Sequence, residues 1–437
     1  MRVHYQTFGC KANQYDTERM RQEIEARGGG TTDARSDADV VVVNTCTVTN
    51  QADAEARRYI RRVRRENPAA RVVVAGCSAA LLADRYEAME GVAAVVPGHD
   101  PVSVAEGTTG GGLVQLGLAR SLDRIDSEPI GASLLRERRG ATRGWLKVQD
   151  GCDRKCSFCA TRLARGVSRS RDPEEVVAEA RVLAETHAEL VVTGIHIGHY
   201  GLDLEPRWTL GRLVALLLDR LPDVRFRLGS VEATEVDEVL LGLLEGSGGQ
   251  LAPHLHMPLQ SGADPVLKRM RRWHTREQYR SRALEIASRM HPLGLGADVI
   301  TGFPGETDAD HANTVRLIEE LPFTYLHVFP FSPRSGTVAD ALSREMPVPQ
   351  RVAGERAREL RDLAIEKGHA YRGRRSGSEA VVAPEGQGDN GLTGDYLRVD
   401  VPGTEGPVPA GLFRGTLRGD ADHLYIASPG TPARIET

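Results

Sequence analysis

The sequence contains no long apolar run that is free of charged residues, although 40% of its 437 residues are hydrophobic. A helix that crosses a membrane needs about 20 consecutive apolar residues, so the pattern argues against a membrane protein. It also leaves no room for a secretory or transit peptide, because Met1 leads directly into the strand-like stretch Arg2–Phe8. We therefore expect a soluble cytoplasmic protein without a membrane partner.

Cysteine is scarce, with six residues in the whole chain. The cytoplasm is reducing, so disulfides are not expected there, and the cysteines of such a protein more often bind metals or serve redox chemistry. They fall into two sets by their spacing. Three are far apart in the sequence and are called the dispersed triad, Cys10, Cys46 and Cys77. Three are close together and are called the local triad, Cys152, Cys156 and Cys159.

An excess of positive charge is also missing, since the formal net charge is −4. Any contact with a nucleic acid must therefore come from local basic patches and not from a global field. The candidate patches are Arg57, Arg58, Arg61, Arg62, Arg64 and Arg65; Arg136, Arg138, Arg139 and Arg143; and Arg162, Arg165, Arg169 and Arg171. Each patch has an alternative interpretation as a solvated helix face.

The length indicates roughly two to four domains. At the amino-terminal end, apolar runs alternate with helical stretches, which predicts a parallel sheet covered by helices. The runs are Val3–Phe8, Val40–Val43, Val72–Ala75 and Val92–Val96. We assign residues 1–115 to this amino-terminal domain. Residues 116–137, within a stretch rich in Gly, Ser and Thr that begins near residue 103, are expected to be a linker.

A second alternating series predicts a parallel α/β barrel, complete or partial, of the (β/α)6 type. Its expected strands are Trp145–Val148, Leu190–Thr193, Val224–Gly229, His254–Met257, Ala297–Thr301 and Tyr325–Phe329. The long charged helical pattern Pro349–Tyr371 could pack outside this barrel. Residues 138–372 are expected to form the central domain.

After residue 372 the pattern changes to short β-like runs divided by Gly, Pro and Asp. This composition predicts a small all-β barrel over residues 373–437. The runs are Glu379–Ala383, Tyr396–Val401, Phe413–Leu417 and His423–Ala427. The fold class is therefore α/β, with an amino-terminal parallel sheet, a central barrel and a small carboxy-terminal β-barrel.

The local triad has the pattern C-x3-C-x2-C and follows the first expected barrel strand. Three thiolates on so short a loop can hold three irons of a cubane cluster and leave the fourth iron open. The aromatic residue Phe158, next to the last cysteine, could lean over the adenine of a ligand at that iron. A structural zinc loop is the alternative, but structural zinc sites have four ligands and no fourth cysteine lies nearby in the sequence.

The local triad and its loop resemble the radical S-adenosylmethionine superfamily. The resemblance implies that the three cysteines are catalytic: their 4Fe–4S cluster binds S-adenosylmethionine, reduces its sulfonium and releases a 5′-deoxyadenosyl radical. It also implies cofactor contacts at residues that follow the later strands, namely Gly194, Ser230, Glu232 and Gly302. Ordinary strand-to-helix turns would require the glycines in any case.

Each cysteine of the dispersed triad follows an expected parallel strand and precedes a helix. The carboxyl ends of parallel strands share one edge of a sheet, where ligands bind in open α/β folds, so we expect the three thiols to converge. Helix amino termini nearby favour thiolates and an anionic cluster. Three buried cysteines that only fill the core are the alternative.

The residues around both triads resemble the methylthiotransferase family. The matching stretches are Thr7–Asn13, Val43–Thr49, Ala75–Cys77 and Gly151–Arg171. In that family a second 4Fe–4S cluster on three amino-terminal cysteines carries, at its open iron, the sulfur to be inserted. One stretch departs from the family pattern: Ala160–Leu163 stands where apolar residues and a proline are common. The substrate contacts of that loop are therefore not carried over.

Further stretches are similar to the branch that acts on N6-threonylcarbamoyladenosine next to the anticodon of tRNA. They are Asn44–Thr49, Thr193–Gly198, His254–Gly262 and His327–Arg334. The branch implies that one S-adenosylmethionine methylates a sulfur on the second cluster. A second S-adenosylmethionine yields the radical that takes hydrogen from adenosine C2, and the methylthio group is then placed there. The carboxy-terminal unit resembles the TRAM-like RNA-binding domain of the family through Gly391–Val399.

The expected partners are the anticodon stem-loop of tRNA and a low-potential electron donor such as flavodoxin or ferredoxin, and the chain is expected to be a monomer. Four histidines are expected to be hydrogen-bonded structural groups and not metal ligands: His196, His199, His254 and His256. Two alternatives stay open. The same chemistry could modify isopentenyladenosine in tRNA or an aspartate of a ribosomal protein. The chain could also be a non-catalytic iron–sulfur protein that binds RNA or senses redox state, although the complete local triad argues against this.

Overall fold

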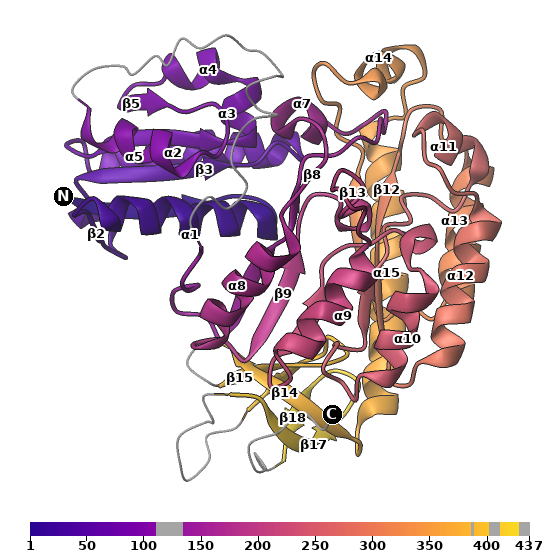
Figure 1. Ribbon diagram of the computed structural model, residues 1–437. Helices are drawn as coiled ribbons and strands as arrows, with labels where there is room; N and C mark the ends of the chain where they lie inside the picture. Colours follow the sequence, from indigo (N-terminus) through magenta and orange to yellow (C-terminus); the bar gives the residue numbers. More distant parts are fainter. Residues whose placement is uncertain (111–133, 386–388, 402–410, 428–437) are drawn as a thin grey trace. The chain divides into compact units, whose positions relative to one another are not determined.

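The computed structural model describes residues 1–110, 134–385, 389–401 and 411–427 (Figure 1). The chain divides into two compact units. Unit 1 comprises Met1–Arg136, Gln149–Arg171 and Ser332–Thr337, and unit 2 comprises Glu137–Val148, Asp172–Phe331 and Val338–Thr437. Most of the expected linker, residues 116–137, lies outside the described residues. The local triad therefore belongs to the same unit as the dispersed triad.

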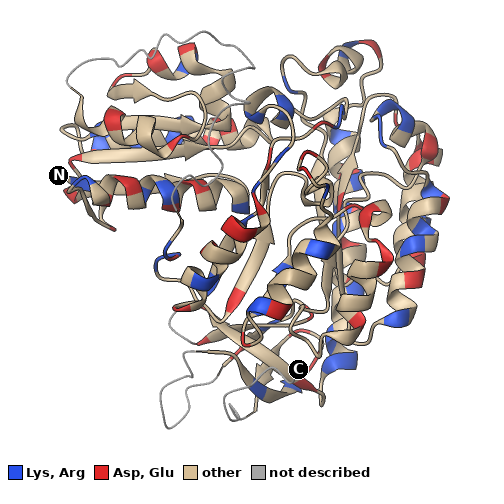
Figure 2. Ribbon diagram, in the orientation of Figure 1, with Lys and Arg blue, Asp and Glu red and all other residues tan. Residues whose placement is uncertain are grey.

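Unit 1 is built on a five-stranded parallel sheet in the order β2–β1–β3–β4–β5. Its strands are β1 (Arg2–Thr7), β2 (Gly30–Thr31), β3 (Val40–Thr45), β4 (Arg71–Gly76) and β5 (Val92–Val95). The central strand β3 is buried along its whole length and carries no charged residue (Figure 2), as expected of a parallel strand covered on both faces. The four strands expected from the sequence are confirmed, and the short edge strand β2 is an addition.

Helices cover both faces of this sheet. The helices α1 (Lys11–Ala26) and α5 (Pro101–Thr109) pack on one face. The helices α2 (Asn50–Glu66), α3 (Cys77–Leu81) and α4 (Ala83–Glu87) pack on the other, and a short 3-10 turn η1 (Arg35–Asp37) precedes β3. Helix α5 occupies part of the stretch that the sequence indicated as irregular, because Asp100 caps its first turn and Pro101 begins it.

Unit 1 also contains the segment that carries the local triad. Two short strands, β7 (Gln149–Asp150) and β8 (Arg169–Ser170), pair antiparallel and close the base of this segment. Between them lie the cysteine loop and the helix α7 (Thr161–Arg165). The segment is thus a closed loop whose two ends are fixed to each other.

Unit 2 contains the partial barrel. The strands β6 (Arg143–Lys147), β9 (Glu189–Thr193) and β10 (Arg225–Leu228) form one parallel sheet, and β11 (His254–His256), β12 (Gly294–Thr301) and β13 (Tyr325–Pro330) form another. Single parallel bridges, Phe226 to Leu251 and Ser230 to His256, join β10 to the edge at β11. The six expected strands are thereby confirmed as one curved parallel array.

Helices and turns connect the strands of the barrel. They are α8 (Pro173–Ala184), η2 (Ile197–His199), α9 (Leu210–Arg220), η3 (Ala233–Glu235), α10 (Glu238–Gly246), α11 (Asp264–Arg269), α12 (Arg276–Arg289), α13 (Asp308–Glu320) and α14 (Val338–Glu345). The expected outer helix is α15 (Gln350–Arg375). It packs against β12, where the Thr301 hydroxyl donates to the Ala353 carbonyl oxygen at 3.0 Å.

The carboxy-terminal part of unit 2 is a closed β-barrel in the order β14–β15–β16–β18–β17. Its strands are β14 (Glu379–Glu385), β15 (Asn390–Thr393), β16 (Arg398–Asp400), β17 (Phe413–Gly419) and β18 (Leu424–Ile426). Four of them match the expected runs, and β15 is an addition. The barrel encloses an apolar core that includes Val382 and Phe413, neither of which is exposed to solvent.

A buried cluster of charges holds the β-barrel against strand β10. Arg225 donates to the Val381 carbonyl oxygen at 2.8 Å, and Arg227 donates to the Gly394 carbonyl oxygen at 2.8 Å. Both guanidinium groups pair with the carboxylate of Glu189, which is fully buried. The small barrel is therefore fixed to the strand by hydrogen bonds to its backbone.

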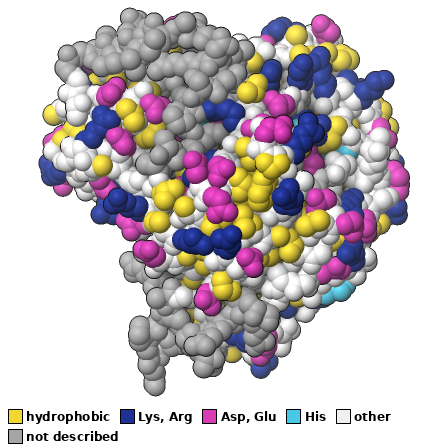
Figure 3. Space-filling model, in the orientation of Figure 1, with side chains coloured by type: hydrophobic (Ala, Val, Ile, Leu, Met, Phe, Trp, Pro, Cys, Tyr) yellow, Lys and Arg dark blue, Asp and Glu magenta, His cyan; other side chains and the backbone are white. Residues whose placement is uncertain are grey.

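Among the described residues, none of the helices is both long enough and apolar enough to cross a membrane. On the face drawn in Figure 3, positive and negative side chains are interspersed among the described residues and no large area of one sign appears. This agrees with the small net charge of the sequence.

Candidate active site

The structure brings the dispersed triad together. Cys10 is the residue before α1, Cys46 follows β3, and Cys77 is the first residue of α3. Gly9 has φ +101° and lies so close to Cys46 that a Cβ atom on it would lie 2.6 Å from the Cys46 Sγ. The thiols of Cys10 and Cys46 are both close enough to raise the pKa of Cys77, although burial has the larger effect. The convergence expected from the topology is therefore present.

Two of these thiols are buried, whereas Cys10 is exposed. Burial raises the pKa of Cys46 to about 11 and that of Cys77 to about 12, so both are neutral thiols at pH 7 in the metal-free chain. None of the six cysteines forms a disulfide. Metal binding would displace the thiol protons, because the thiolate is the metal ligand.

The structure gathers neither cysteine triad tightly around a single point. Sulfur ligands about 2.3 Å from one zinc ion lie roughly 3.8 Å apart. Within the described ranges, the triplets of potential ligand atoms that all lie within 4.8 Å of one another include neither cysteine triad. In the metal-free chain each triad thus has at least two sulfur atoms that are more than 4.8 Å apart.

The local triad lies on the closed loop between β7 and β8. The Cys152 amide donates to the Gly166 carbonyl oxygen at 3.1 Å, and the Cys159 amide donates to the Cys156 carbonyl oxygen at 3.3 Å. Gly151 has φ +69°, and a Cβ atom on it would lie 1.7 Å from the Val167 carbonyl oxygen. Only glycine fits at that position, directly before the first cysteine.

The local triad is more open to solvent than the dispersed one. Cys152 and Cys156 are half-buried, Cys159 is exposed, and the half-buried Phe158 stands beside it. Burial raises the pKa of Cys152 to about 12. The loop therefore presents its sulfur atoms at a partly open surface, as a site for an exchangeable cofactor requires.

A buried arginine lies between the two triads. Arg165, the last residue of α7, is 1% exposed. Its Nε donates to the Cys77 Sγ at 3.1 Å, and its Nη1 donates to both carboxylate oxygens of Asp150 at 3.0 Å. Its Nη2 donates to the Asn13 Oδ1 at 2.6 Å and the Asp16 Oδ2 at 2.7 Å. One side chain thus contacts the dispersed triad and the base of the local loop.

A second buried arginine in unit 1 holds the segment after Cys46. Arg334 donates to the Thr47 Oγ1 at 2.5 Å and to the Asp53 Oδ2 at 2.6 Å. Its other terminal nitrogen donates to the Asn50 Oδ1 at 2.7 Å. Arg334 therefore fixes the turn between Cys46 and helix α2.

These two arginine roles were not expected from the sequence. Arg165 and Arg171 were expected to belong to a surface patch, which is wrong because they are 1% and 2% exposed. The signal that could have found Arg165 is its position directly after the cysteine loop, in the stretch that carries the family resemblance. The patch on α2 does lie at the surface, where its exposed members are Arg58, Arg61, Arg62 and Arg65.

The other expected cofactor contacts lie in unit 2, with Gly194 and Gly302 directly after β9 and β12 and with Ser230 and Glu232 in the turn between β10 and η3. Gly194 follows β9, and Ser230 is exposed at the bridge to β11. Glu232 is 7% exposed and accepts a hydrogen bond from Arg272 at 2.5 Å, while burial raises its pKa. Gly302 has φ +69°, and its Cβ would lie 2.3 Å from the Ala353 Cβ in α15. The packing of α15 is therefore sufficient to require glycine at residue 302, without any contact with a cofactor.

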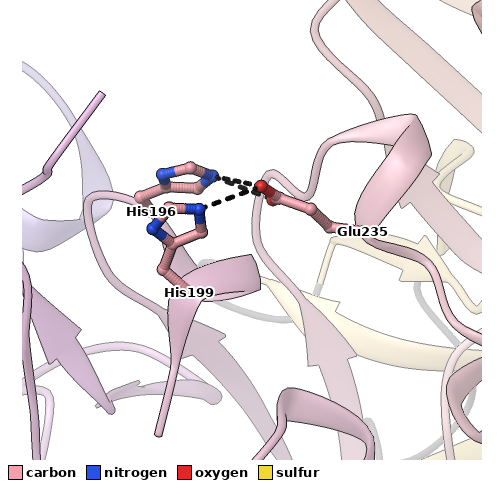
Figure 4. A group of neighbouring side chains, drawn as sticks. All are labelled: His196, His199 and Glu235. Carbon is pink, nitrogen blue, oxygen red and sulfur yellow. Dashed lines mark hydrogen bonds and ion pairs between the residues drawn. The ribbon is translucent and has the colours of Figure 1, made fainter. Parts of the chain in front are cut away.

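The four histidines expected to be hydrogen-bonded, His196, His199, His254 and His256, all have polar partners. His196 Nε2 lies 2.8 Å from a carboxylate oxygen of Glu235, and His199 Nε2 lies 3.4 Å from the other. Figure 4 shows both rings facing that carboxylate, and the rings stack with their centroids 4.0 Å apart. His254 and His256 both contact the Tyr325 hydroxyl, at 2.8 Å and 3.0 Å. Each histidine therefore has a structural partner.

Comparison with known proteins gives two matching family models. The model of the radical SAM superfamily matches residues 146–318, and the model described as uncharacterized protein family UPF0004 matches residues 2–98. The threonylcarbamoyladenosine tRNA methylthiotransferase MtaB of Bacillus subtilis is 36% identical over 92% of this chain and 91% of its own length. This chain belongs to the radical SAM methylthiotransferase family. The resemblance drawn from the two triads is thereby confirmed.

Other members of the family carry two kinds of name. The MtaB protein of Aquifex aeolicus is 32% identical over 91% of this chain and 96% of its own length. A tRNA-2-methylthio-N(6)-dimethylallyladenosine synthase of Bacillus licheniformis is 31% identical over 89% of this chain and 77% of its own length. Members of the methylthiotransferase family that modify different nucleosides are thus similar to this chain.

A solved structure shows the same fold. The radical S-adenosylmethionine methyltransferase TsrM of Kitasatospora setae, solved with cobalamin and a [4Fe-4S] cluster, superimposes with a TM-score of 0.55 at 17% identity. The match covers 75% of this chain and 74% of that one. It confirms the radical SAM fold class.

Proposed function

We propose that this protein is a tRNA-modifying enzyme that places a methylthio group on C2 of N6-threonylcarbamoyladenosine next to the anticodon. The observation that carries the proposal is the presence of both cysteine triads in one unit, with the dispersed triad brought together at one edge of the parallel sheet. The names of the relatives with 32% to 36% identity over about nine-tenths of the chain support this nucleoside.

The local triad holds a 4Fe–4S cluster that binds S-adenosylmethionine, and the dispersed triad holds a second 4Fe–4S cluster. When bound, the first cluster and its cofactor supply the radical that removes hydrogen from C2, and the second supplies the sulfur. The protein positions these groups. Gly151 permits the turn before Cys152, and the half-buried Phe158 beside Cys159 would contact the adenine of the cofactor. Further contacts with the cofactor come from Gly194, Ser230, Glu232 and Gly302.

The small β-barrel of unit 2 contacts RNA, and the exposed arginines of α2 in unit 1 are a separate region for contact with RNA. Small β-barrels of this kind bind backbone and stacked bases, and exposed arginines neutralise phosphates. The barrel is firmly attached, because Arg225 and Arg227 bond to its backbone. The enzyme acts in the cytoplasm as a monomer and receives electrons from a low-potential donor such as flavodoxin or ferredoxin.

Nucleoside mass spectrometry of tRNA from a deletion strain tests the function. The expected result is loss of the 2-methylthio form of N6-threonylcarbamoyladenosine and accumulation of the unmethylthiolated nucleoside. Restoration by the intact gene is the control. Loss of the 2-methylthio form of dimethylallyladenosine instead would assign the chain to the other tRNA branch. An unchanged profile of both nucleosides would exclude both tRNA functions and leave a ribosomal-protein aspartate or a non-catalytic role.

A further inference from the structure

We propose that Arg165 is a positioning residue for the cluster of the dispersed triad. Its side chain bonds to the Cys77 sulfur and fixes the loops that hold this cluster to the base of the local loop. This inference rests on the proposed assignment of the dispersed triad as cluster ligands. Every residue that it uses lies in unit 1.

Arg165 uses its whole guanidinium group. Its five hydrogen bonds connect one sulfur, two carboxylates and one amide. A planar fork with five donors matches this arrangement, whereas a lysine ammonium has three donors at one point. The sequence delivers the fork here because α7 starts directly after the cysteine loop and ends at Arg165, where Gly166 turns the chain with φ +74°.

Arg165 is connected to all three cysteine loops of the dispersed triad, directly or through Asn13. Asn13, which accepts a bond from Arg165, donates to the Phe8 carbonyl oxygen at 2.9 Å and to the Thr45 carbonyl oxygen at 2.8 Å. Those two carbonyls belong to the chain directly before the Cys10 and Cys46 loops. The third cysteine, Cys77, is bonded directly. Arg165 therefore reaches every loop of the triad.

The positive charge of Arg165 is matched by buried negative charges. Arg165 is buried between two carboxylates, Asp16 and Asp150, and the latter is also 2.8 Å from the His99 Nε2. Asp150 in turn accepts from the Gly151 amide at 2.8 Å, directly before the local triad. The same side chain thus orders the base of the loop that holds the first cluster.

A bond from N–H to a ligating sulfur has a measurable consequence. Such bonds, and positive charge nearby, stabilise the reduced form of an iron–sulfur cluster and raise its reduction potential. A residue that acts only as a buried structural ion pair would change stability and leave the potential unchanged. The potential of the dispersed-triad cluster is therefore the deciding quantity.

The experiment uses the full chain with Cys152→Ala, Cys156→Ala and Cys159→Ala, which leaves only the dispersed triad to hold a cluster. The protein is reconstituted anaerobically with ferrous iron and sulfide. Iron per chain is measured, and a potentiometric titration followed by electron paramagnetic resonance gives the midpoint potential. Arg165→Lys and Arg165→Gln are compared with Arg19→Gln, which replaces another buried arginine that contacts Tyr15.

The expected result is a lower midpoint potential in both Arg165 variants, with the larger shift in Arg165→Gln, and an unchanged potential in Arg19→Gln. Full clusters with the parent's potential in both Arg165 variants would overturn the proposal. If the wild-type dispersed triad holds no cluster, the proposed function fails in its two-cluster assignment, and that result is distinct from failure of the role of Arg165.

If the single Arg165 variants do not fold, the double variant Arg165→Gln/Asp16→Asn is used, because it removes one charge of each sign from the buried cluster. A double variant that keeps the circular dichroism of the parent but holds little iron supports the proposal. A double variant that keeps its iron but has a lowered midpoint potential also supports the proposal. Loss of native circular dichroism in this variant as well as in both single variants would make Arg165 a structural ion-pair residue and would overturn it.

Discussion

Asn13 on helix α1 donates its side-chain amide to the carbonyl oxygen of Thr45, 2.8 Å away at the end of β3. This bond fixes the residue before Cys46 to the helix that begins after Cys10. A buried amide that is removed leaves its carbonyl partners unpaired, which costs about 1–3 kcal/mol. The geometry of the dispersed triad therefore depends on a residue that is not itself a ligand.

Asn13→Ala is expected to lower the iron content of the reconstituted enzyme toward that of a protein with one cluster, because the Cys10 and Cys46 loops lose their common anchor. Asn67→Ala is the matched control, since Asn67 bonds to the carbonyls of Arg35, Ser36 and Ala38 and not to a cysteine loop. Iron analysis decides the matter. Equal iron in the two variants would contradict the role of Asn13.

The raised pKa values of Cys46 and Cys77 predict a pH-dependent pattern of alkylation. A thiol with a raised pKa keeps its proton, so its thiolate fraction at pH 7 is small and grows about tenfold per pH unit up to the pKa. In the metal-free protein we expect iodoacetamide to modify the exposed Cys10 and Cys159 first. Cys46 and Cys77 should react slowly at pH 7 and faster toward pH 10. Peptide mass spectrometry measures each rate, and labelling of Cys46 as fast as Cys10 at pH 7 would refute the prediction.

Glu189 is expected to hold the β-barrel in place. Burial alone would raise its pKa, but Arg225 and Arg227 lower it well below its usual range. Since the folded pKa lies below the unfolded one, this carboxylate stabilises the fold at neutral pH, and its contribution is lost as the pH falls below the ordinary range for glutamate. Glu189→Gln leaves two buried arginines without their anion, at a cost of about 3–5 kcal/mol.

Limited proteolysis measures this effect. Glu189→Gln should release a fragment that contains the β-barrel much faster than wild type, and Tm should fall by several degrees. Glu245→Gln, which removes an ion pair with Arg289 at the surface, is the control and should leave both unchanged. Wild-type resistance to protease in the Glu189 variant would show that the barrel does not depend on this cluster.

Replacement of glycine by alanine is expected to have opposite effects on stability at two positions, one packed against α15 and one within it. Gly302→Ala forces a Cβ to within 2.3 Å of the Ala353 Cβ at a positive φ, and we expect it to destabilise by about 1–3 kcal/mol. Gly354→Ala has open space around it inside the helix, and we expect it to stabilise by about 0.5–1 kcal/mol. Thermal unfolding of both variants compares them. A Gly302→Ala protein as stable as wild type would mean that α15 does not pack tightly there.

The strand positions could be predicted from the sequence because buried parallel strands are short runs of apolar residues. β3 is such a run, four valines in a row. β2 and β15 could not be predicted in this way, since they are short and contain glycine and polar residues. The convergence of the dispersed triad could also be predicted, because the ends of parallel strands share one edge.

The burial of the arginines at the site could not be predicted from the sequence, because a buried arginine and an exposed one look alike there. Arg165 stands in a stretch with three other arginines and reads as a surface patch. Its burial depends on Asp16 and Asn13, which are far away in the sequence and come close only through the fold. Arg334 ends the stretch His327–Arg334 that resembles the family, and nothing in that stretch indicates that its side chain is buried.

The division of work between the two triads is the central claim, and one assay tests it most directly. Purified Cys46→Ala and Cys156→Ala enzymes are reconstituted and incubated with S-adenosylmethionine, reductant and tRNA that carries N6-threonylcarbamoyladenosine. 5′-Deoxyadenosine and methylthiolated nucleoside are then measured. The account predicts that Cys46→Ala still forms 5′-deoxyadenosine but no methylthiolated nucleoside, and that Cys156→Ala forms neither. Methylthiolated tRNA from the Cys46 variant would contradict it.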